Sequence, residues 1–390
     1  MLHPSESARG GGSGRMSTDP REASEDLIDR IPLRLLQILE ELGVSPSEIA
    51  EAAARDELHL LVVDTMIGAP SLRLTSEEVS AQSGISASDL RRVWRALGFI
   101  EPQPGEKVFS PVDIAASRSF SGLLGTRPEE LDVAIQLARV IGSSMARVAE
   151  AEILSSNGLK DLNRPNRWLS NTEIAERFAL YSTAIVPSVP QLLGYVWLRH
   201  LHAASRRVLL MRDNSTGADL SEFDLSVGFL DLVGFTVLSQ QLTTEELARV
   251  VNRFEEVAHN TVTSLGGRLV KMIGDEVMFV CQDPQVAVEI ALVLQEEYKG
   301  DRDLSEVRAG VATGRVLAKD GDYYGPIVNL ASRIVNIATP SSILISEPVA
   351  DRLRGKFSTD VKALQPRFLK DLGYVQLYRV RRGVRVSGAN

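Results

Sequence analysis

Hydrophobic residues recur at helical spacing through the first half of the chain. In DLIDRIPLRLLQILEEL (26–42), leucines and isoleucines stand three and four positions apart, and PEELDVAIQLARVIGSSMARVAEAEIL (128–154) repeats the pattern. Turn-forming residues at 43–46, 68–70, 102–105 and 157–158 separate the helices. We expect a last helical stretch over 171–211, kinked or split by Pro187 and Pro190. The pattern predicts an all-helical domain over residues 24–210.

The periodicity changes after residue 221. SVGFLDLVGF (226–235) indicates a strand that ends in a turn, residues 244–265 an amphipathic helix, and GGRLVKMIGDEVMFVC (266–281) two strands around a Gly-Asp turn. A helix over 286–298, a strand at VRAGVAT, a helix that begins at Pro326, and strands at ILIS and VQLYRV follow. Alternating strands and helices of this kind predict an α+β domain with a mixed sheet over residues 222–382.

Composition agrees with two domains. The chain has 390 residues, 44% of them hydrophobic, which is enough for more than one core. Residues 1–23 are expected to be disordered, and within them Met16 is a candidate alternative start, which would make 1–15 a vector remnant or artefact. Residues 211–221 are a predicted linker and 383–390 a tail. Cys281 is the single cysteine and no stretch of about 18 apolar residues occurs. We therefore expect a cytoplasmic protein without a membrane span.

Two aspartates are the first candidates for chemistry. Asp231 stands where an apolar strand ends, and Asp275 stands at the tip of the following hairpin. Either one alone is more often a turn former. Together with a triphosphate, two such carboxylates could hold magnesium or manganese. No histidine, cysteine or serine arrangement in this half competes as a covalent catalyst.

A polar stripe marks the helix that begins at Pro326. Asn329, Arg333 and Asn336 recur at four and three positions and share one face, while the opposite face is apolar. An arginine and an asparagine on one face suit a phosphate and a sugar. The alternative is an ordinary solvated face.

These segments together resemble the catalytic domain of class III nucleotidyl cyclases. The motifs FLDLVGFT, GGRLVKMIGDEVMF, GDYYGPIVNLASR and LGYVQLYRV occur in the family's order across residues 225–381. The resemblance implies a ferredoxin-like catalytic domain that converts ATP to cyclic AMP and pyrophosphate. It implies a homodimer with two shared active sites, each holding two divalent cations, Mg²⁺ or Mn²⁺.

The resemblance also assigns roles to individual residues. Asp231 and Asp275 match the metal ligands. Lys271 and Asp322 match the pair that reads adenine, the lysine donating to N1 and the aspartate accepting from the exocyclic amine. Guanine reverses that pattern, so a guanylyl or dual-specificity cyclase is the less favoured alternative.

Three further positions complete the implied site. Asn329 matches the residue that positions the ribose, and Arg333 matches the one that stabilises charge on the α-phosphate. Lys370, in FLKDLG, is a weaker candidate for the triphosphate.

The helical half is expected to regulate the enzyme. It is similar to the N-terminal regulatory domain of soluble actinobacterial adenylyl cyclases, on helical pattern and position more than on sharp motifs. Residues 71–110 contain a predicted helix-turn-helix, in which Thr75 caps one helix, Gly84 lies in the turn and a second helix begins near Ser86. An alternative is therefore a DNA- or ligand-binding regulator that uses a cyclase-like domain for dimerisation.

The charge does not favour that alternative. The net charge is −8, and the arginines of the second helix, Arg91, Arg92 and Arg95, are offset by nearby acids, so nucleic acid is not an expected partner. A small molecule, a lipid or a proton is the candidate signal. His200 and His202 lie just before the junction and could respond to pH, although ordinary exposed or packed histidines are the alternative.

Overall fold

The computed structural model describes residues 28–68, 73–124, 128–155, 168–212, 222–302, 304–355 and 359–383. The expected disordered segment 1–23, the break at 157–158, and most of the linker 211–221 and of the tail 383–390 lie outside the described residues. The chain divides into two compact units, Met1–Ala204 and Ser205–Asn390. A helical region followed by a mixed sheet confirms the predicted fold class.

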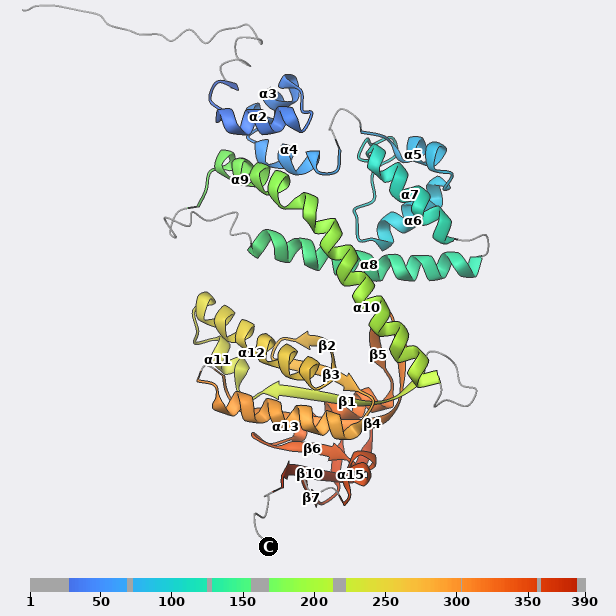
Figure 1. Ribbon diagram of the computed structural model, residues 1–390, viewed down its shortest axis with the longest axis vertical. Helices are drawn as coiled ribbons and strands as arrows, with labels where there is room; N and C mark the ends of the chain where they lie inside the picture. Colours follow the sequence, from blue (N-terminus) through green and yellow to red (C-terminus); the bar gives the residue numbers. More distant parts are fainter. Residues whose placement is uncertain are drawn as a thin grey trace, which may run out of the picture. The chain divides into compact units, whose positions relative to one another are not determined.

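The first unit is helical throughout its described part (Figure 1). Its elements are α2 (Leu33–Glu41), α3 (Pro46–Ala54), α4 (Leu58–Thr65), α5 (Ser76–Ser83), α6 (Ala87–Ala96), α7 (Pro111–Leu124), α8 (Pro128–Ser155), α9 (Asn171–Ala184) and most of α10 (Val189–Arg212). One hydrophobic cluster joins α2, α3 and α4 to α9, which is distant in sequence, and a second joins α5, α6, α7 and α8. Each cluster buries apolar positions at helical spacing, which explains why the sequence pattern located these helices.

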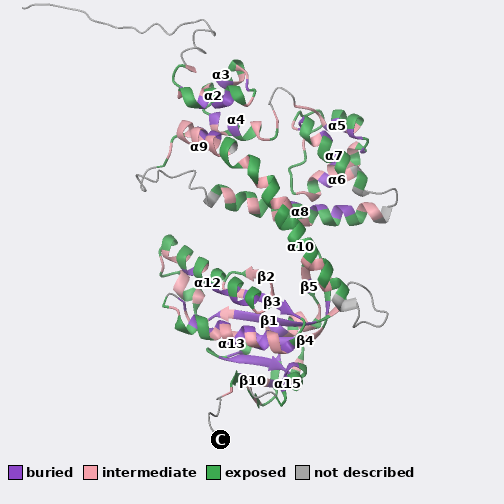
Figure 2. Cartoon of the chain, in the orientation of Figure 1, coloured by how far each residue is buried: buried purple, intermediate pink, exposed green. Residues whose placement is uncertain are grey.

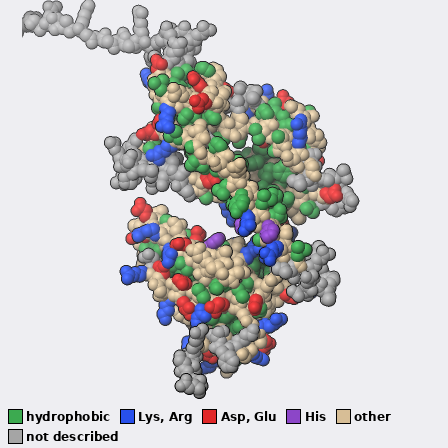
Figure 3. Space-filling model, viewed as in Figure 1, with side chains coloured by type: hydrophobic (Ala, Val, Ile, Leu, Met, Phe, Trp, Pro, Cys, Tyr) green, Lys and Arg blue, Asp and Glu red, His purple; other side chains and the backbone are tan. Residues whose placement is uncertain are grey.

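The predicted helix-turn-helix is present. Thr75 caps α5 with a capping box, Gly84 ends that helix at φ 79°, and Ser86 caps α6. A positive φ strongly favours glycine at such a helix end. The arginines of α6 all pair with carboxylates of the same unit, at 3.3–3.9 Å: Arg91 with Glu77 and Glu101, Arg92 with Asp89 and Asp132, Arg95 with Glu101. On the face shown in Figure 3, acidic and basic side chains of the described residues are interspersed.

The two prolines split the last helical stretch, as the sequence predicted. Helix α9 ends at Ala184, a 3₁₀ turn follows over Val186–Ser188, and α10 begins at Val189 with Pro190 in its first turn. Helix α10 continues to Arg212 and so includes the first two residues of the predicted linker. Much of α10 is exposed (Figure 2). Among the described residues, no helix has both the length and the apolar character needed to cross a membrane.

The second unit is built on one mixed sheet, whose strands run in the order β2-β3-β1-β4-β6-β10-β7. The strands are β1 (Glu222–Leu232), β2 (Arg268–Ile273), β3 (Glu276–Cys281), β4 (Val307–Lys319), β6 (Ile343–Ser346), β7 (Thr359–Ala363) and β10 (Leu377–Arg382). Strand β5 (Asp322–Tyr324) pairs with β4 alone, and β8 (Arg367–Leu369) with β9 (Gly373–Val375) forms a separate hairpin. The β4–β6 pair is parallel and the other pairs are antiparallel. Strand β1 thus lies inside the sheet, between β3 and β4.

Both faces of this sheet are covered by helices. Alternation along β1 sends Leu230 and Leu232 into a core shared with α12 (Thr244–Ser264) and α13 (Pro284–Gly300), which cross the sheet in Figure 1. It sends Leu225, Val227 and Phe229 into a second core shared with α14 (Pro326–Ile337). The short helices α11 (Phe235–Ser239) and α15 (Glu347–Leu353) complete the unit. We call the second side of the sheet the α14 face.

Helix α14 packs very closely on the sheet because β4 carries a glycine beneath it. A Cβ at Gly310 would stand 2.5 Å from the backbone nitrogen of Val335 and 2.7 Å from the carbonyl oxygen of Ala331. No other residue type leaves room for the helix backbone at that distance. Gly310 therefore fixes the height of α14, and with it the polar face of that helix, above the sheet.

Candidate active site

Two aspartates lie together where β1 ends. Asp231 is the last residue but one of β1, and Asp275 occupies the two-residue turn between β2 and β3, where Gly274 has a φ of 63°. The backbone N–H of Leu232, next to Asp231, donates to the carbonyl oxygen of Asp275 over 3.1 Å. The hairpin tip is thereby attached to the end of the neighbouring strand.

Asp231 has a charged neighbour on each adjoining strand. In the sheet register it stands opposite Glu276 of β3 and Arg308 of β4, so these three side chains share one face. The guanidinium of Arg308 donates from Nε to Asp231 Oδ2 over 2.6 Å, and its other end donates to the carbonyl oxygen of Asn336, at the end of α14, over 3.2 Å. Alternation from Phe229 places this row on the α14 face.

The row has more negative than positive charge. Burial raises the pKa of Asp231, Arg308 opposes that rise, and the charge of Asp275 adds to it. Burial, and then the charges of Asp231 and Asp275, raise the pKa of Glu276 to about 7. Three carboxyl groups therefore compete for one guanidinium, and added positive charge would relieve their repulsion.

This donor set fits a hard divalent cation. Carboxylate oxygens are the ligands that Mg²⁺ and Mn²⁺ prefer. Within the described residues, no three His, Cys, Asp or Glu side chains form a complete metal-binding group. Further ligands would have to come from water and from substrate phosphates, as is usual for Mg²⁺ in enzymes that act on nucleotides.

Lys271 and Asp322 meet although their strands are not paired. Strand β2 is at the edge of the sheet, and β5 pairs with β4 across the sheet from it. Nevertheless, Lys271 Nζ forms an ion pair with Asp322 Oδ2. The other carboxylate oxygen of Asp322 accepts from the backbone N–H of Tyr323 over 2.8 Å. A donor and an acceptor are thus held side by side.

The two remaining implied residues project from α14. Asn329 is exposed near the start of the helix, and Arg333, half-buried one turn later, makes a 3.6 Å ion pair with Asp371. Asp371 lies in the turn between β8 and β9 at a φ of 70°. Lys370, the sequence neighbour of Asp371, is exposed in that same turn. The weak candidate therefore lies on the segment that contacts Arg333.

The family resemblance divides the six implied positions into two groups. Asp231 and Asp275 make the first group; Lys271, Asp322, Asn329 and Arg333 make the second. In the part of the chain that the structure describes, no hydrogen bond or ion pair between side chains links the first group to the second. His200 and His202 belong to neither group and are exposed on α10.

Sequence reasoning missed Arg308 and Glu276. Both have sequence signals, since each is a charged residue that adjoins an apolar strand, in EVRAGVAT and GDEVMFV. Their importance depends on the strand register, because each faces Asp231 only when β3 and β4 flank β1. A strand order is needed to find them.

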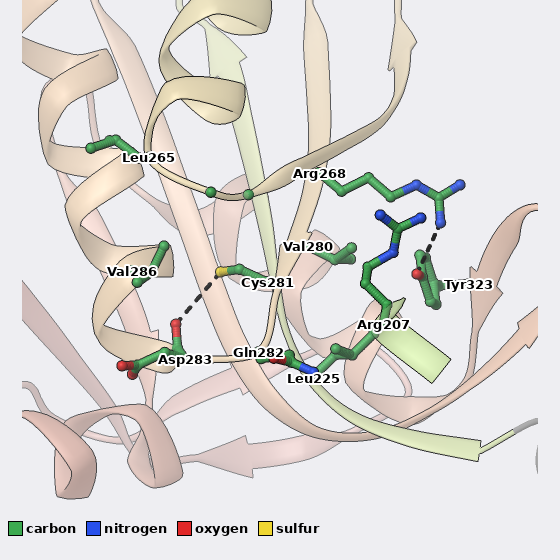
Figure 4. A pocket seen from close by; sticks show the side chains of 12 residues that line it. Arg207, Leu225, Leu265, Arg268, Val280, Cys281, Gln282, Asp283, Val286 and Tyr323 are labelled. Atoms are coloured by element: carbon green, nitrogen blue, oxygen red, sulfur yellow. Dashed lines mark hydrogen bonds between the residues drawn. The ribbon is translucent and has the colours of Figure 1, made fainter. Parts of the chain in front are cut away.

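A cavity of about 350 Å³ lies elsewhere in this unit (Figure 4). Its lining includes Gly266, Gly267, Arg268, Cys281 and Tyr323, from the start of β2, the end of β3 and β5. None of the six implied positions lines it. The cavity is therefore next to β2 and β5 and separate from the aspartates.

Comparisons with known proteins identify the family of both regions of the chain. Residues 221–381 match the family model of the adenylate and guanylate cyclase catalytic domain, and residues 26–205 match that of the adenylate cyclase regulatory domain. An adenylate cyclase of Streptomyces coelicolor is 35% identical over 80% of this chain and 80% of the relative. One of Glutamicibacter nicotianae is 32% identical over 78% of each. A pH-sensitive adenylate cyclase of Mycobacterium tuberculosis is 28% identical over 91% of this chain and 89% of the relative.

The chain belongs to the adenylate cyclases that have a regulatory domain before the catalytic domain. The family recognised from the sequence motifs is confirmed, and so is the prediction that the chain is an enzyme.

Proposed function

We propose that this enzyme converts ATP to 3′,5′-cyclic AMP and pyrophosphate at sites shared between two identical chains. One observation carries the proposal. The carboxylates Asp231 and Asp275 and the Lys271–Asp322 pair occur in one catalytic unit, yet among the described residues no hydrogen bond or ion pair between side chains joins them. A second copy related by a twofold axis would bring the first group of one chain to the second group of the other.

The reaction is an internal displacement at phosphorus. The ribose 3′ oxygen forms a bond to the α-phosphorus, the bond from that phosphorus to the bridging oxygen breaks, and pyrophosphate leaves with the electron pair. The 3′-hydroxyl loses its proton in the process. Such a reaction depends on alignment and on stabilising spread negative charge, and it needs no protein nucleophile.

In the proposed site each residue has a defined task. Asp231 and Asp275 hold two divalent cations, which when bound would favour loss of the 3′ proton and neutralise the triphosphate. Asn329 orients the ribose. Arg333 exchanges its exposed 3.6 Å contact with Asp371 for the α-phosphate, where charge develops. Lys370, in the same turn as Asp371, is the weaker candidate to contact the outer phosphates.

Substrate choice is assigned to Lys271 and Asp322. Adenine presents an acceptor at N1 and a donor at its exocyclic amine, which complement a lysine and a carboxylate. Guanine presents the reverse, so each protein group would face a group of its own kind. The ion pair that joins Lys271 and Asp322 supports this assignment, because it places a donor and an acceptor side by side.

A double exchange of the purine pair tests the proposal. Lys271→Glu with Asp322→Cys removes the donor and replaces the acceptor, so we expect ATP turnover to fall at least about 100-fold, as for the loss of two buried polar contacts. Purified full-length chains are assayed for cyclic AMP with manganese. Glu222→Gln with Arg315→Gln, an exposed 3.5 Å pair in the same unit, is the matched control. Unchanged cyclic AMP production by the purine variant would overturn the assignment.

The regulatory region is proposed to act through α10, which leads toward the catalytic unit. A change in the register or length of such a helix is a known way to alter a dimeric enzyme. The exposed His200 and His202 make a proton one candidate signal, alongside a small molecule or lipid. Use of ATP and the single cysteine, which is buried, favour a cytoplasmic location.

A further inference from the structure

We propose that Arg268 is a positioning residue that holds Asp322 in place for purine selection. The inference rests on the proposed function, because it deepens the role assigned there to the Lys271–Asp322 pair. Strand β5 pairs with β4 and not with β2. The β4–β5 hairpin must therefore reach across the sheet to bring Asp322 to Lys271. Side chains, not a backbone ladder, make that connection.

Arg268 supplies two of these side-chain contacts. Its guanidinium donates to the carbonyl oxygen of Gly321 over 2.9 Å and to the hydroxyl of Tyr323 over 3.0 Å. The guanidinium carbon also lies 5.5 Å from the centre of the Tyr323 ring (Figure 4). Gly321 and Tyr323 are the residues immediately before and after Asp322. A single guanidinium therefore binds the backbone of Gly321, before Asp322, and the side chain of Tyr323, after it.

A bulge in β2 makes this arrangement possible. Lys271 stands three positions after Arg268, and in a regular strand that spacing would place them on opposite faces. The pairing of β2 with β3 shifts between Leu269 and Lys271, so one extra residue is accommodated there. The flanking Leu269 and Met272 both pack in the α12–α13 core, which leaves Val270 and Lys271 on the other side. Arg268 and Lys271 thereby share the α14 face and both reach β5.

Tyr323, the side chain that accepts from Arg268, is buried. Tyr323 is 7% exposed and belongs to the core of the α14 face. A planar guanidinium with two fixed acceptors loses little freedom when it binds them, whereas a lysine ammonium has three donors on a flexible stem and no planar fork to match both acceptors. Arg268 therefore connects the position of Asp322 to the packed core. Without it, the Lys271–Asp322 pair would be the only hydrogen bond or ion pair between side chains that holds the β4–β5 hairpin to β2 among the described residues.

The preference of the enzyme for ATP over GTP tests whether Arg268 positions Asp322. Full-length Arg268→Ala, Arg268→Lys and Tyr323→Phe chains are assayed with ATP and GTP, and kcat and KM are determined separately. Loss of both contacts in Arg268→Ala should raise the KM for ATP about tenfold and lower the ATP-over-GTP preference by a similar factor, the usual effect of a charge-assisted hydrogen bond. We expect kcat to change by no more than about twofold. Tyr323→Phe should shift the preference less, because Gly321 still accepts, and Arg268→Lys should lie between.

The preference separates positioning from simple stabilisation. A fraction of unfolded enzyme lowers the turnover of both nucleotides equally and leaves their ratio unchanged. Arg253→Ala is the control, since this arginine on α12 also loses two close contacts, to Asp301 at 2.8 Å and Glu256 at 2.9 Å, in the same unit. Where GTP turnover is too slow to follow, inhibition of the ATP reaction by GTP gives the same ratio.

Each outcome decides one question. If Lys271→Ala leaves the ATP-over-GTP preference unchanged, the proposed purine reading is wrong and the role of Arg268 falls with it. If Lys271→Ala lowers the preference while Arg268→Ala and Tyr323→Phe do not, the purine reading stands and the positioning role is wrong. Should Arg268→Ala fail to fold, Arg268→Lys and Tyr323→Phe decide the matter by the same ratio.

Discussion

At the scale of single residues, the ion pair between Asp231 and Arg308 lies at the end of β1. The side chain of Asp231 is 15% exposed and that of Arg308 is 29% exposed, so their 2.6 Å pair is partly desolvated. Exposed pairs contribute about 0–1 kcal/mol, and breaking a fully buried pair costs about 3–5 kcal/mol. The Asp231–Arg308 pair should lie between these limits. Burial and the charge of Asp275 raise the pKa of Asp231, and Arg308 opposes that rise.

The thiol of Cys281 should be chemically unreactive. It ends β3, its thiol is buried, and its Sγ donates to the carbonyl oxygen of Asp283 over 3.5 Å. Burial, with a smaller effect of Asp283, raises the pKa of Cys281 to about 12. Since the thiolate is the reactive form, we expect alkylation by iodoacetamide at pH 8 to be at least about tenfold slower in the folded chain than in urea.

The same shift has a consequence for stability. Because the folded pKa of Cys281 exceeds the unfolded value of about 8.5, the contribution of its neutral thiol to stability is complete below the unfolded value. It is lost as the pH rises toward about 12. Cys281→Ala, followed by thermal unfolding between pH 8 and pH 10, should lose part of this alkaline dependence. Equal alkylation rates in the folded and denatured chains would contradict the burial argument.

At the scale of elements, the contact of α14 with β4 sets the position of Asn329 and Arg333. Replacing Gly310 with alanine would place a methyl group 2.5 Å from a backbone atom of α14, so the helix must move. We expect an unfolding free energy lower by about 1–3 kcal/mol, as for overpacked cores, and a fall in cyclase activity beyond the loss of folded protein. Urea unfolding and activity per folded molecule are the measurements.

Gly300→Ala is the matched control for this prediction. Gly300 ends α13 in the same unit, and a Cβ there meets no atom within 4 Å. Alanine should be neutral or stabilising by up to about 1 kcal/mol at such a helical position. If Gly310→Ala behaves like Gly300→Ala, the close approach of α14 does not position the site.

Elements were largely predictable from the sequence, whereas their contacts were not. The spacing of leucines located the helices, and Pro187, Pro190, Thr75 and Gly84 act through local geometry that any fold would impose. The bulge in β2 depends on how β3 pairs with β2, and no residue in LVKMI predicts the bulge. The partnership of Asp231 with Arg308 likewise follows from strands that are 77 positions apart in sequence.

The six implied positions are a different case. Their roles come from the family resemblance, and each assignment remains a prediction. The residue pattern alone favoured a turn-forming role for Asp231 or Asp275 taken singly. What the structure adds is physical: Asp231 and Asp275 share one end of the sheet, and Lys271 contacts Asp322.

At the scale of the whole molecule, we propose that no single chain assembles a complete site. Asp231→Ala should remove a metal ligand and Arg333→Ala the charge that stabilises the α-phosphate, so each full-length variant alone should lose at least about 100-fold in activity. In a twofold dimer each variant damages a different half of the shared site. A mixed dimer then contains one site with both residues intact.

Mixing the two inactive variants is therefore the most direct test. Subunit exchange at equal amounts should produce about one half mixed dimers, each with one intact site of two, and so about a quarter of wild-type activity. Asp231→Ala mixed with Asp275→Ala is the control, because both substitutions damage the same group and no intact site can form. We expect recovery of cyclic AMP synthesis in the first mixture and none in the second. A first mixture no more active than the sum of its two components would contradict this expectation.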